Sequence, residues 1–519
     1  MLNSLRIQNL RSLHDTGFIN IRPITILVGE NSCGKSTLLR TFPLLRQSVE
    51  TDTRSSILWF GKYVDFGDFD QAKSRGSTNK EIIFSFELSV PLPVMTTPYR
   101  LLRNSTKNAK RVKVTVDLRL ASKGKDGLTR TSGLNIKIEN NSIRIDINEA
   151  GKVSEIEING VSYPEHIESM TYLPASKLLP ALRGKQDKSE PVTYSWRDAF
   201  NLAKPQEHLI DAIKKFAHGN VDKESLIYSA RAIAIGADDD VLKSIQKASS
   251  TITWQKKIKN LTMDSTDFKK IRDLAIITSI PVFTLSIDDI LESTFKKVSY
   301  IAPLRASAER YYRSQDLSVR ELDSKGENLA MFVRNLTEKE KSSLDLWTNE
   351  HFGFHLEVKY NGGHVIAGIE YEKTKEHYNI ADMGFGFSQV MPIIVQIWTL
   401  IHKPTKSMIT DTNYTYAIEQ PELHLHPRMQ AKIASVLAKA VILSRTNGIL
   451  LNLIIETHSE TIINKIGLMI ANEEISSEDT NIIIVSRDNE KSASKIEISK
   501  FDSEGTLINW PYGFFDIEV

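Results

Sequence analysis

A glycine-rich loop near the start of the chain constrains its fold most. The sequence GENSCGKS, residues 29–36, fits the pattern G-x-x-x-x-G-K-[ST]. Its glycines let backbone N–H groups wrap phosphate oxygens, and a following helix adds the positive end of its dipole. Lys35 would reach the β- and γ-phosphates, and Ser36 would hold Mg²⁺. We expect nucleotide contacts from Gly29, Asn31, Ser32, Cys33, Gly34, Lys35, Ser36 and Thr37.

The residues around this loop favour a phosphate-binding role over a chance glycine turn. Residues 24–28, ITILV, form the apolar and β-branched run that is typical of a buried strand. Residues 38–49 predict a helix despite Pro43. The loop therefore lies between a strand and a helix, the context in which such a motif binds phosphate. Cys33 is expected to fill space in the loop and to have no redox role.

Composition limits where the protein works. A chain of 519 residues is too long for one core, so two or three domains are expected. Its net charge of +2 gives no strong overall attraction to nucleic acid, so any such site must be a local patch. The single cysteine excludes an internal disulfide. Since no signal peptide or membrane-length apolar run is recognised, a cytoplasmic location is expected.

The order of apolar patterns predicts an α/β fold. Residues 1–95 and 296–519 are expected to form two lobes of one P-loop domain with a mixed β-sheet. Residues 96–168 alternate apolar and polar side chains over short segments, which predicts an antiparallel β subdomain. Residues 169–295 are predicted to be largely helical. Residues 298–305 are predicted to be a strand that re-enters the main body, and the apolar runs at 414–418, 449–456 and 481–486 are typical of a covered parallel sheet.

A second motif, TYAIEQPELHLHP, spans residues 415–427. Glu419 ends an apolar strand, where a P-loop enzyme places the carboxylate of its Mg²⁺ site. Glu422 could polarise the attacking water; the alternative is that it caps a helix or pairs with a neighbour. His424 and His426 do not predict a metal site, because no cysteine or further histidine lies close in the sequence.

Two further motifs carry polar residues at element ends. In 452–462, NLIIETHSETI, His458 follows a buried strand and is well placed to bond a γ-phosphate, although a lone histidine is usually structural. In 382–398, Ser388 and Gln389 follow Gly384 and Gly386 and precede a helix, which predicts a second anion-binding helix N-terminus. Two such helix ends would meet at one phosphate if two chains each supplied one of them.

The order of these motifs resembles the ABC-type ATPases of the RecF/SMC/OLD group. In that family two heads sandwich two ATP molecules, so the resemblance implies an ATP- and Mg²⁺-dependent homodimer or higher assembly. Lys35 and Ser36 match the Walker A positions, Glu419 the Walker B acid, and His458 the switch histidine. Ser388 and Gln389 match the signature motif that reaches the partner's γ-phosphate. Residues 424–427 fall at the D-loop.

Two positions depart from that family's pattern or match it weakly. In transporter-type members a catalytic glutamate directly follows the Walker B acid, but this chain has Gln420 there. Glu422 could take this role, as the E-x-P-E pattern of the OLD-like group implies. If it does not, hydrolysis would be slow and the protein would act as an ATP-gated clamp. Gln71 matches the Mg²⁺-contacting glutamine of the Q-loop only weakly, and a solvated loop residue is an equal alternative.

Two phrases, YIAPLRASAERYY at 300–312 and WPYGFFD at 510–516, resemble OLD-like ATPases of prokaryotic anti-phage defence. The Septu-type PtuA ATPases, with their retron-associated form, are most similar. This resemblance implies a separate HNH partner nuclease (PtuB-like) and, for a retron form, a reverse transcriptase with its msDNA. The stretch after His458 is too short for the Toprim nuclease domain of OLD proteins, so no nuclease is expected in the chain. The alternatives are a RecF-like DNA repair clamp, a transporter ATPase, and a scaffold that binds ATP without turnover.

Two stretches are locally basic, at residues 100–130 and 177–188. Either could contact nucleic-acid phosphates, although a solvated loop explains the first equally well and the second is expected to be a mobile loop. Neither has the interleaved aromatic residues of a single-strand stacking site. The basic residues of the first stretch are Arg100, Arg103, Lys107, Lys110, Arg111, Lys113, Arg119, Lys123, Lys125 and Arg130.

Overall fold

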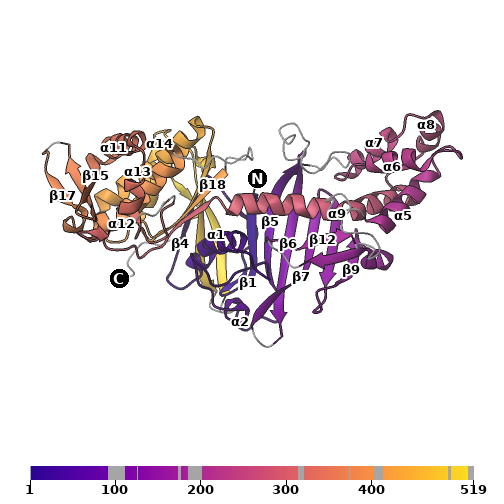
Figure 1. The fold of residues 1–519 in the computed structure, drawn as a ribbon, viewed down its shortest axis with the longest axis horizontal. Coiled ribbons are helices and arrows are strands. Elements are labelled where there is room, and N and C mark those ends of the chain that lie inside the picture. Colours follow the sequence, from indigo (N-terminus) through magenta and orange to yellow (C-terminus); the bar gives the residue numbers. More distant parts are fainter. Residues whose placement is uncertain are drawn as a thin grey trace. The chain divides into compact units, whose positions relative to one another are not determined.

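The computed structural model describes residues 2–91, 111–124, 127–173, 177–184, 202–313, 319, 321–372, 374–402, 413–488 and 493–511. The chain folds into two compact units, each built from two separate segments. Unit 1 comprises Met1–Asn20 and Leu44–Lys296, and unit 2 comprises Ile21–Pro43 and Lys297–Val519. The lobe expected from residues 1–95 is therefore shared between the two units (Figure 1).

An antiparallel sheet forms the body of unit 1. Its strands follow the order β10-β9-β8-β7-β6-β5-β1-β2, and β3 pairs with β1. Buried and exposed residues alternate along β6, as its sequence pattern predicts. The strands are β1 (Leu2–Leu10), β2 (Leu13–Asp15), β3 (Ile19–Asn20), β5 (Ile82–Pro91), β6 (Arg111–Lys123), β7 (Leu128–Ile138), β8 (Asn141–Ile147), β9 (Val153–Ile158) and β10 (Val161–Ser162).

Helices make up most of the remainder of unit 1. The long helix α9 runs across the strands of the sheet (Figure 1), where Phe295 packs edge-on against Phe86 with ring centroids 5.8 Å apart. The region from residue 169 was expected to be helical, but it begins with a hairpin of β11 (Met170–Leu173) and β12 (Ala181–Gly184). The helices are α2 (Phe69–Ala72), α5 (Ala203–Lys214), α6 (Lys223–Arg231), α7 (Asp238–Lys247), α8 (Ile252–Ile258) and α9 (Thr266–Phe295).

Unit 2 is built on a seven-stranded mixed sheet in the order β13-β18-β19-β4-β20-β21-β22. The pairs from β13 to β20 are parallel, and β21 and β22 complete the sheet in antiparallel fashion. The expected strand at 298–305 ends earlier, at Ile301. The strands are β4 (Ile24–Gly29), β13 (Val298–Ile301), β18 (Asn413–Glu419), β19 (Leu450–Glu456), β20 (Thr480–Asp488), β21 (Ala493–Phe501) and β22 (Leu507–Ile508).

Helices α12, α13 and α14 follow strands or turns of unit 2 and supply much of its buried apolar core. Helix α1 spans Lys35–Glu50, and its residues up to Pro43 belong to unit 2. A smaller sheet of β14 (Tyr312–Arg313), β15 (Phe354–Asn361), β16 (His364–Tyr371) and β17 (His377–Asn379) completes the unit. The remaining helices are α10 (Leu329–Arg334), α11 (Glu338–Phe352), α12 (Phe385–His402), α13 (Pro427–Thr446) and α14 (Glu460–Ala471).

Two helices, α9 and α12, are long and apolar enough to cross a membrane by length and composition. The sequence analysis recognised no such run. In each helix 72% of the most apolar window is buried inside the protein. Their apolar side chains are thus accounted for by packing in the interior, as in the core helices of a soluble protein.

Candidate nucleotide-binding site

The parallel strands of unit 2 bring three chain segments together at their carboxyl ends. Strand β19 lies between β18 and β4, with Glu419 opposite Glu456 in the register and Glu456 opposite Leu27. The glycine-rich loop follows β4, and α1 begins at Lys35. Ligand sites of open α/β sheets form at such carboxyl ends, because the loops that leave neighbouring strands meet there.

The glycine-rich loop is held in a backbone shape that only glycine fits at its start. Gly29 has φ 145°, and a Cβ there would lie 1.9 Å from the carbonyl oxygen of Val485 on β20. Cys33 anchors the other side of the loop, because its Sγ donates to the carbonyl oxygens of Glu30 and Val485, both at 2.8 Å. Burial raises the pKa of the Cys33 thiol, which fits the expected space-filling role.

The residues that follow the loop offer groups suited to a phosphate chain. The Nζ atom of Lys35 donates to the carbonyl oxygens of Gly29 at 2.9 Å and Glu30 at 2.5 Å, and the side chain is buried. The Oγ atom of Ser36 donates to Oε1 of Glu456 at 2.8 Å. A helix N-terminus, a lysine and a hydroxyl beside a carboxylate are the groups that Mg²⁺ and a triphosphate require. The residues present therefore fit Mg²⁺·ATP.

Glu419 is fully engaged by side chains of its own unit. Both carboxylate oxygens accept from Arg40, from Nε and NH2 at 2.8 Å each, and Oε1 also accepts from the Tyr300 hydroxyl at 2.7 Å. This hydrogen bonding and the charge of Glu419 raise the pKa of Arg40. Arg40 was not predicted from the sequence. Its position one turn after Ser36 on the same helix was the available clue.

Glu456 was also missed, although it ends a buried strand just as Glu419 does. Its side chain is buried, and Oε2 has no hydrogen-bond partner among the described residues. Burial raises the pKa of Glu456 to about 7, and the neighbouring charge of Glu419 adds to this shift. In the sequence ETHS, residues 456–459, only His458 was predicted to have a role. Glu456 is the residue that contacts Ser36.

Glu422 and His458 meet at the same edge of the sheet. The backbone N–H of His458 donates to Oε1 of Glu422 at 2.7 Å, and Oε2 has no partner among the described residues. Burial raises the pKa of Glu422. Partial burial of its ring and the positive charge of Lys35 both lower the pKa of His458, which favours a neutral imidazole.

Ser388 and Gln389, expected to face a second chain, are buried at the start of α12. Gln389 accepts from the N–H of Arg305 at 3.1 Å and donates to its carbonyl oxygen at 2.9 Å. Ser388 accepts from the N–H of Ala308 at 3.1 Å. Arg305 in turn donates to the carbonyl oxygen of Glu419 at 2.7 Å. These two side chains therefore join the first turn of α12 to the segment that follows β13.

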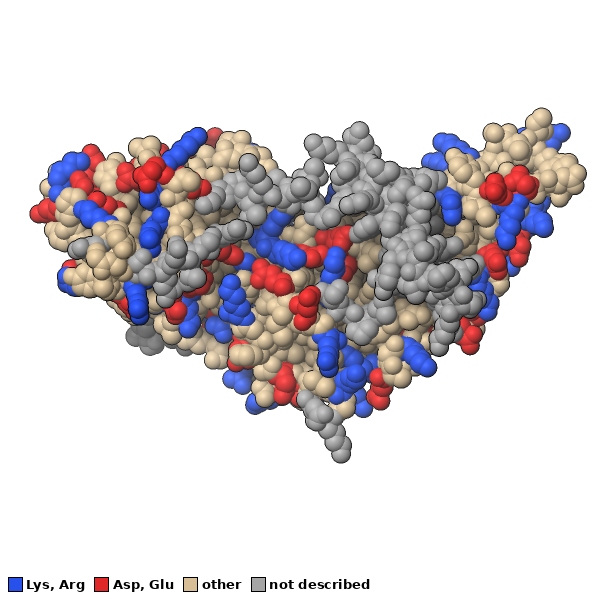
Figure 2. All heavy atoms as spheres, in the orientation of Figure 1, with Lys and Arg blue, Asp and Glu red and all other residues tan. Residues whose placement is uncertain are grey.

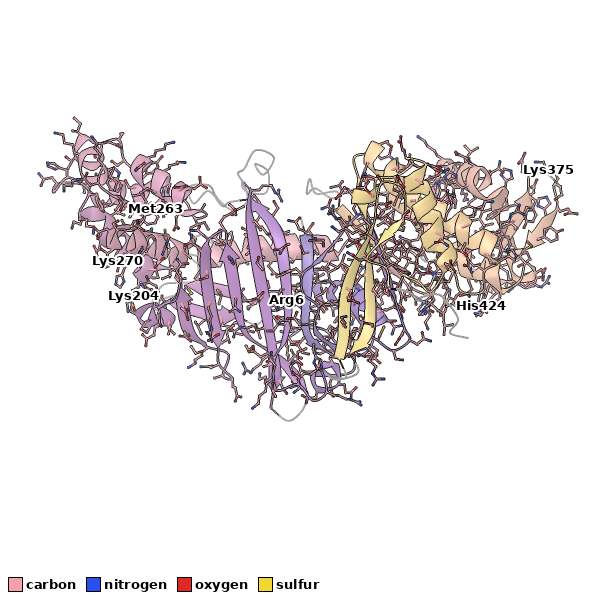
Figure 3. The ribbon with its side chains drawn as sticks, turned by 180° about the vertical axis from the view of Figure 1, so that it is seen from behind. Arg6, Lys204, Met263, Lys270, Lys375 and His424 are labelled. Carbon is pink, nitrogen blue, oxygen red and sulfur yellow. The ribbon has the colours of Figure 1, made fainter. Side chains whose placement is uncertain are left out.

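The histidine-rich loop between β18 and α13 packs against the start of α12. The carbonyl oxygen of His424, labelled in Figure 3, would lie 2.9 Å from a Cβ at Gly386. The His424 ring meets Phe385 edge-on with centroids 4.7 Å apart. His426 caps α13 by accepting the N–H of Arg428 at 3.2 Å. No group of three metal-binding side chains occurs among the described residues.

Gln71 lies in unit 1 on the short helix α2. Its backbone N–H donates to Asp68 Oδ1 at 2.8 Å, and its side-chain amide lies 3.5 Å from Asp68 Oδ2. A role for Gln71 at Mg²⁺ stays a prediction.

The first basic stretch can be followed only on β6 and β7. Acidic and basic side chains are interspersed on the face in Figure 2. On β6, Lys113 pairs with Glu87 at 3.1 Å, and Arg119 pairs with Asp146. Lys177, of the second stretch, binds Asp289 and Glu292 at 2.6 Å each. Arg100, Arg103, Lys107, Lys110 and Lys125 lie outside the described residues.

A comparison with known protein families assigns the chain to one of them. The model of the AAA ATPase domain matches residues 1–463. Endonuclease GajA of Bacillus cereus (strain HuB5-5) is 24% identical over 220 residues, which cover 40% of this chain and only 30% of GajA.

Among solved structures, an SMC head bound to the C-terminal winged-helix domain of ScpA aligns at 10% identity over 97% of this chain and 98% of that one, with a TM-score of 0.36. The SMC head domain from Thermotoga maritima aligns at 10% identity over 96% and 98%, with a TM-score of 0.35. These TM-scores are too low to establish a common arrangement. The family model matches residues 1–463, which is most of the chain, and the protein therefore belongs to the AAA ATPase domain family.

Proposed function

We propose that unit 2 binds Mg²⁺·ATP at the carboxyl edge of its parallel sheet and hydrolyses it slowly. The observation that carries this proposal is the meeting of the glycine-rich loop with Glu456, Glu419 and Glu422 at one edge. Bound Mg²⁺ would supply charge neutralisation for the phosphates. The backbone of the loop and Lys35 would orient the phosphate chain.

In this proposal Glu422 acts as the base toward the attacking water. Its unpartnered Oε2 can accept a proton, and the raised pKa makes it a stronger base than a solvated glutamate. The N–H of His458 fixes the other oxygen of the same carboxylate. The neutral His458 ring can then donate a hydrogen bond to a phosphate oxygen, as its place after β19 allows. Glu422 thus replaces the glutamate that is missing at Gln420.

The proposal extends to a homodimer closed around ATP. The support is the resemblance of the Ser388–Gln389 segment to signature motifs that contact a second subunit's nucleotide. In this structure both side chains are bound to the backbone of residues 305 and 308. Gln389, whose amide oxygen and nitrogen are both bound to the backbone of Arg305, would have to leave that backbone to reach a second subunit's nucleotide.

We further propose that ATP turnover restrains or releases a separate HNH-type nuclease in anti-phage defence, in the cytoplasm. One observation supports this: the resemblance to Septu-type and retron-associated ATPases at residues 300–312 and 510–516. The chain itself is proposed to lack nuclease activity. A retron-associated form would also bind a reverse transcriptase and msDNA, with nucleic acid contacted through local basic patches.

Purification of the chain from its native operon tests the partner proposal. We expect a stoichiometric HNH-type protein, and in a retron a reverse transcriptase with a short RNA–DNA hybrid. The Lys35→Ala variant should keep the complex but lose protection against phage. A chain that arrives alone or with DNA only would contradict this proposal and favour a RecF-like repair clamp. Nuclease activity of the isolated chain would contradict the separate-nuclease proposal.

A further inference from the structure

Two buried glutamates, Glu419 and Glu456, are candidates for the carboxylate that binds Mg²⁺ in this protein. Family resemblance assigns the role to Glu419 at the end of β18. Strand β19, however, lies between β18 and the loop-bearing strand β4. Its last residue, Glu456, is therefore one strand nearer to Ser36 than Glu419 is.

The contacts of the two carboxylates differ in a way that decides between them. Glu456 accepts from Ser36 Oγ at 2.8 Å, which leaves the lone pairs of that hydroxyl free to face a cation. Its other oxygen, Oε2, is buried and has no partner among the described residues, and the side chain is only 2% exposed. A buried carboxylate oxygen without a partner is costly unless a ligand, an ion or an ordered water satisfies it.

Both carboxylate oxygens of Glu419, in contrast, have hydrogen-bond partners. Its two oxygens accept three hydrogen bonds, two from Arg40 and one from Tyr300. The guanidinium of Arg40 also neutralises its charge. A cation at Glu419 would have to displace a bidentate ion pair whose carboxylate is buried, and breaking such a pair is strongly unfavourable.

We propose that Glu456, and not Glu419, is the protein carboxylate in the coordination shell of the Mg²⁺ that accompanies ATP. This inference rests on the proposed nucleotide function of the loop. Ser36 and Glu456 supply the hard oxygen atoms that Mg²⁺ prefers, and the phosphates and water complete its shell. Glu419 is then a positioning residue.

The role of Glu419 follows from its partners. Arg40 lies on α1, the helix that begins with Lys35 and Ser36, and Tyr300 lies on β13. The carboxylate therefore ties the nucleotide-binding helix to two strands of the sheet. In this role it holds α1 on the sheet and stays outside the metal site.

Mn²⁺ binding separates the two acids without relying on hydrolysis. Mn²⁺ replaces Mg²⁺, and electron paramagnetic resonance counts free Mn²⁺ in the presence of the full-length protein and the non-hydrolysable β,γ-imido analogue of ATP. A fluorescent ATP analogue in EDTA measures metal-free nucleotide binding. The variants are Glu456→Gln and, as the matched control, Glu419→Gln. Should Glu419→Gln unfold because Arg40 is left unpaired, the double change Arg40→Gln with Glu419→Gln takes its place.

Glu456→Gln should weaken Mn²⁺ binding to the nucleotide complex by about 10- to 100-fold. Metal-free nucleotide binding should stay within about twofold, since the lost charge acts through the metal. The Glu419 variant should keep Mn²⁺ binding within about threefold of the wild type. Mn²⁺ binding that survives Glu456→Gln, or that is lost equally in both variants, overturns the assignment. A wild-type chain that binds no nucleotide in either assay overturns the proposed function as well.

Discussion

Gly29 shows how closely a single residue of the loop is constrained. Its φ of 145° belongs to a region that residues with a Cβ rarely adopt, and the carbonyl of Val485 occupies the place of that Cβ. The backbone angle and the close carbonyl both constrain the turn at Gly29, and this turn sets the direction of the loop N–H groups that would bind phosphate. The residue therefore matters to stability and to nucleotide binding together.

Gly29→Ala should lower the free energy of unfolding by about 2–5 kcal/mol and abolish detectable ATP binding. The Cβ would push the loop away from β20, which moves the phosphate-binding backbone. Urea unfolding and titration with a fluorescent nucleotide measure the two effects. Gly219→Ala is the matched control, because no atom lies within 4 Å of its added Cβ. Equal behaviour of the two variants would contradict the structure of the loop.

Arg40→Ala should destabilise the protein by about 3–5 kcal/mol, because it leaves the buried charge of Glu419 without its counter-ion. The bidentate pair Arg445–Asp479, with both bonds at 2.7 Å, is more exposed and serves as the control. Arg445→Ala should cost about 1 kcal/mol or less. Chemical denaturation of both variants measures the difference. A loss at Arg40 no larger than that at Arg445 would show that Glu419 is not held as described.

Among the elements, helix α9 is mostly apolar but carries a buried carboxyl group. Asp288 is buried on it and accepts the N–H of Leu179 at 2.8 Å. Burial raises the pKa of Asp288 to about 7, and the charge of Glu292 adds to the shift, while the Leu179 N–H and the Lys177 ammonium oppose it. Asp289 beside it, whose pKa burial raises to about 6, is bound by Lys177.

Stability should therefore depend on pH through this helix. The pKa of an unfolded aspartate is about 3.9, so the native state holds an extra proton between that value and about 7. The free energy of unfolding should fall as pH rises through this window, by up to about 4 kcal/mol from Asp288. Asp288→Asn should flatten the fall, and the exposed Asp211→Asn should not. Urea titrations from pH 5 to 8 measure it, and equal slopes in all three proteins would contradict the prediction.

The elements also show where sequence patterns suffice. The apolar runs at β4, β18, β19 and β20 predicted a parallel sheet, and the alternating runs predicted an antiparallel one, because burial on one or two faces leaves a local pattern. The hairpin β11–β12 was missed within a region interpreted as helical. Its strands are four residues each, too short for a clear period.

The site was predicted only in part, for a reason that belongs to the whole molecule. Lys35, Ser36 and Glu419 follow from local motifs, but the order of strands in a sheet is not written in any one segment. Placing β19 between β18 and β4 is what brings Glu456 to Ser36. The role of Arg40 could not be predicted locally either, because its partner Glu419 lies hundreds of positions away in the sequence. The burial of Ser388 and Gln389 depends on contacts with residues 305–308, and the phrase at 300–312 that contains them did not predict those contacts.

Phosphate release from Mg²⁺·ATP by the purified chain tests the central claim most directly. The wild type should release phosphate, and Lys35→Ala should not. Glu422→Gln should bind ATP as the wild type does but release phosphate about 100-fold more slowly or worse. The exposed Glu474→Gln should match the wild type. Release that is absent from the wild type, or undiminished in Lys35→Ala or Glu422→Gln, would contradict the account.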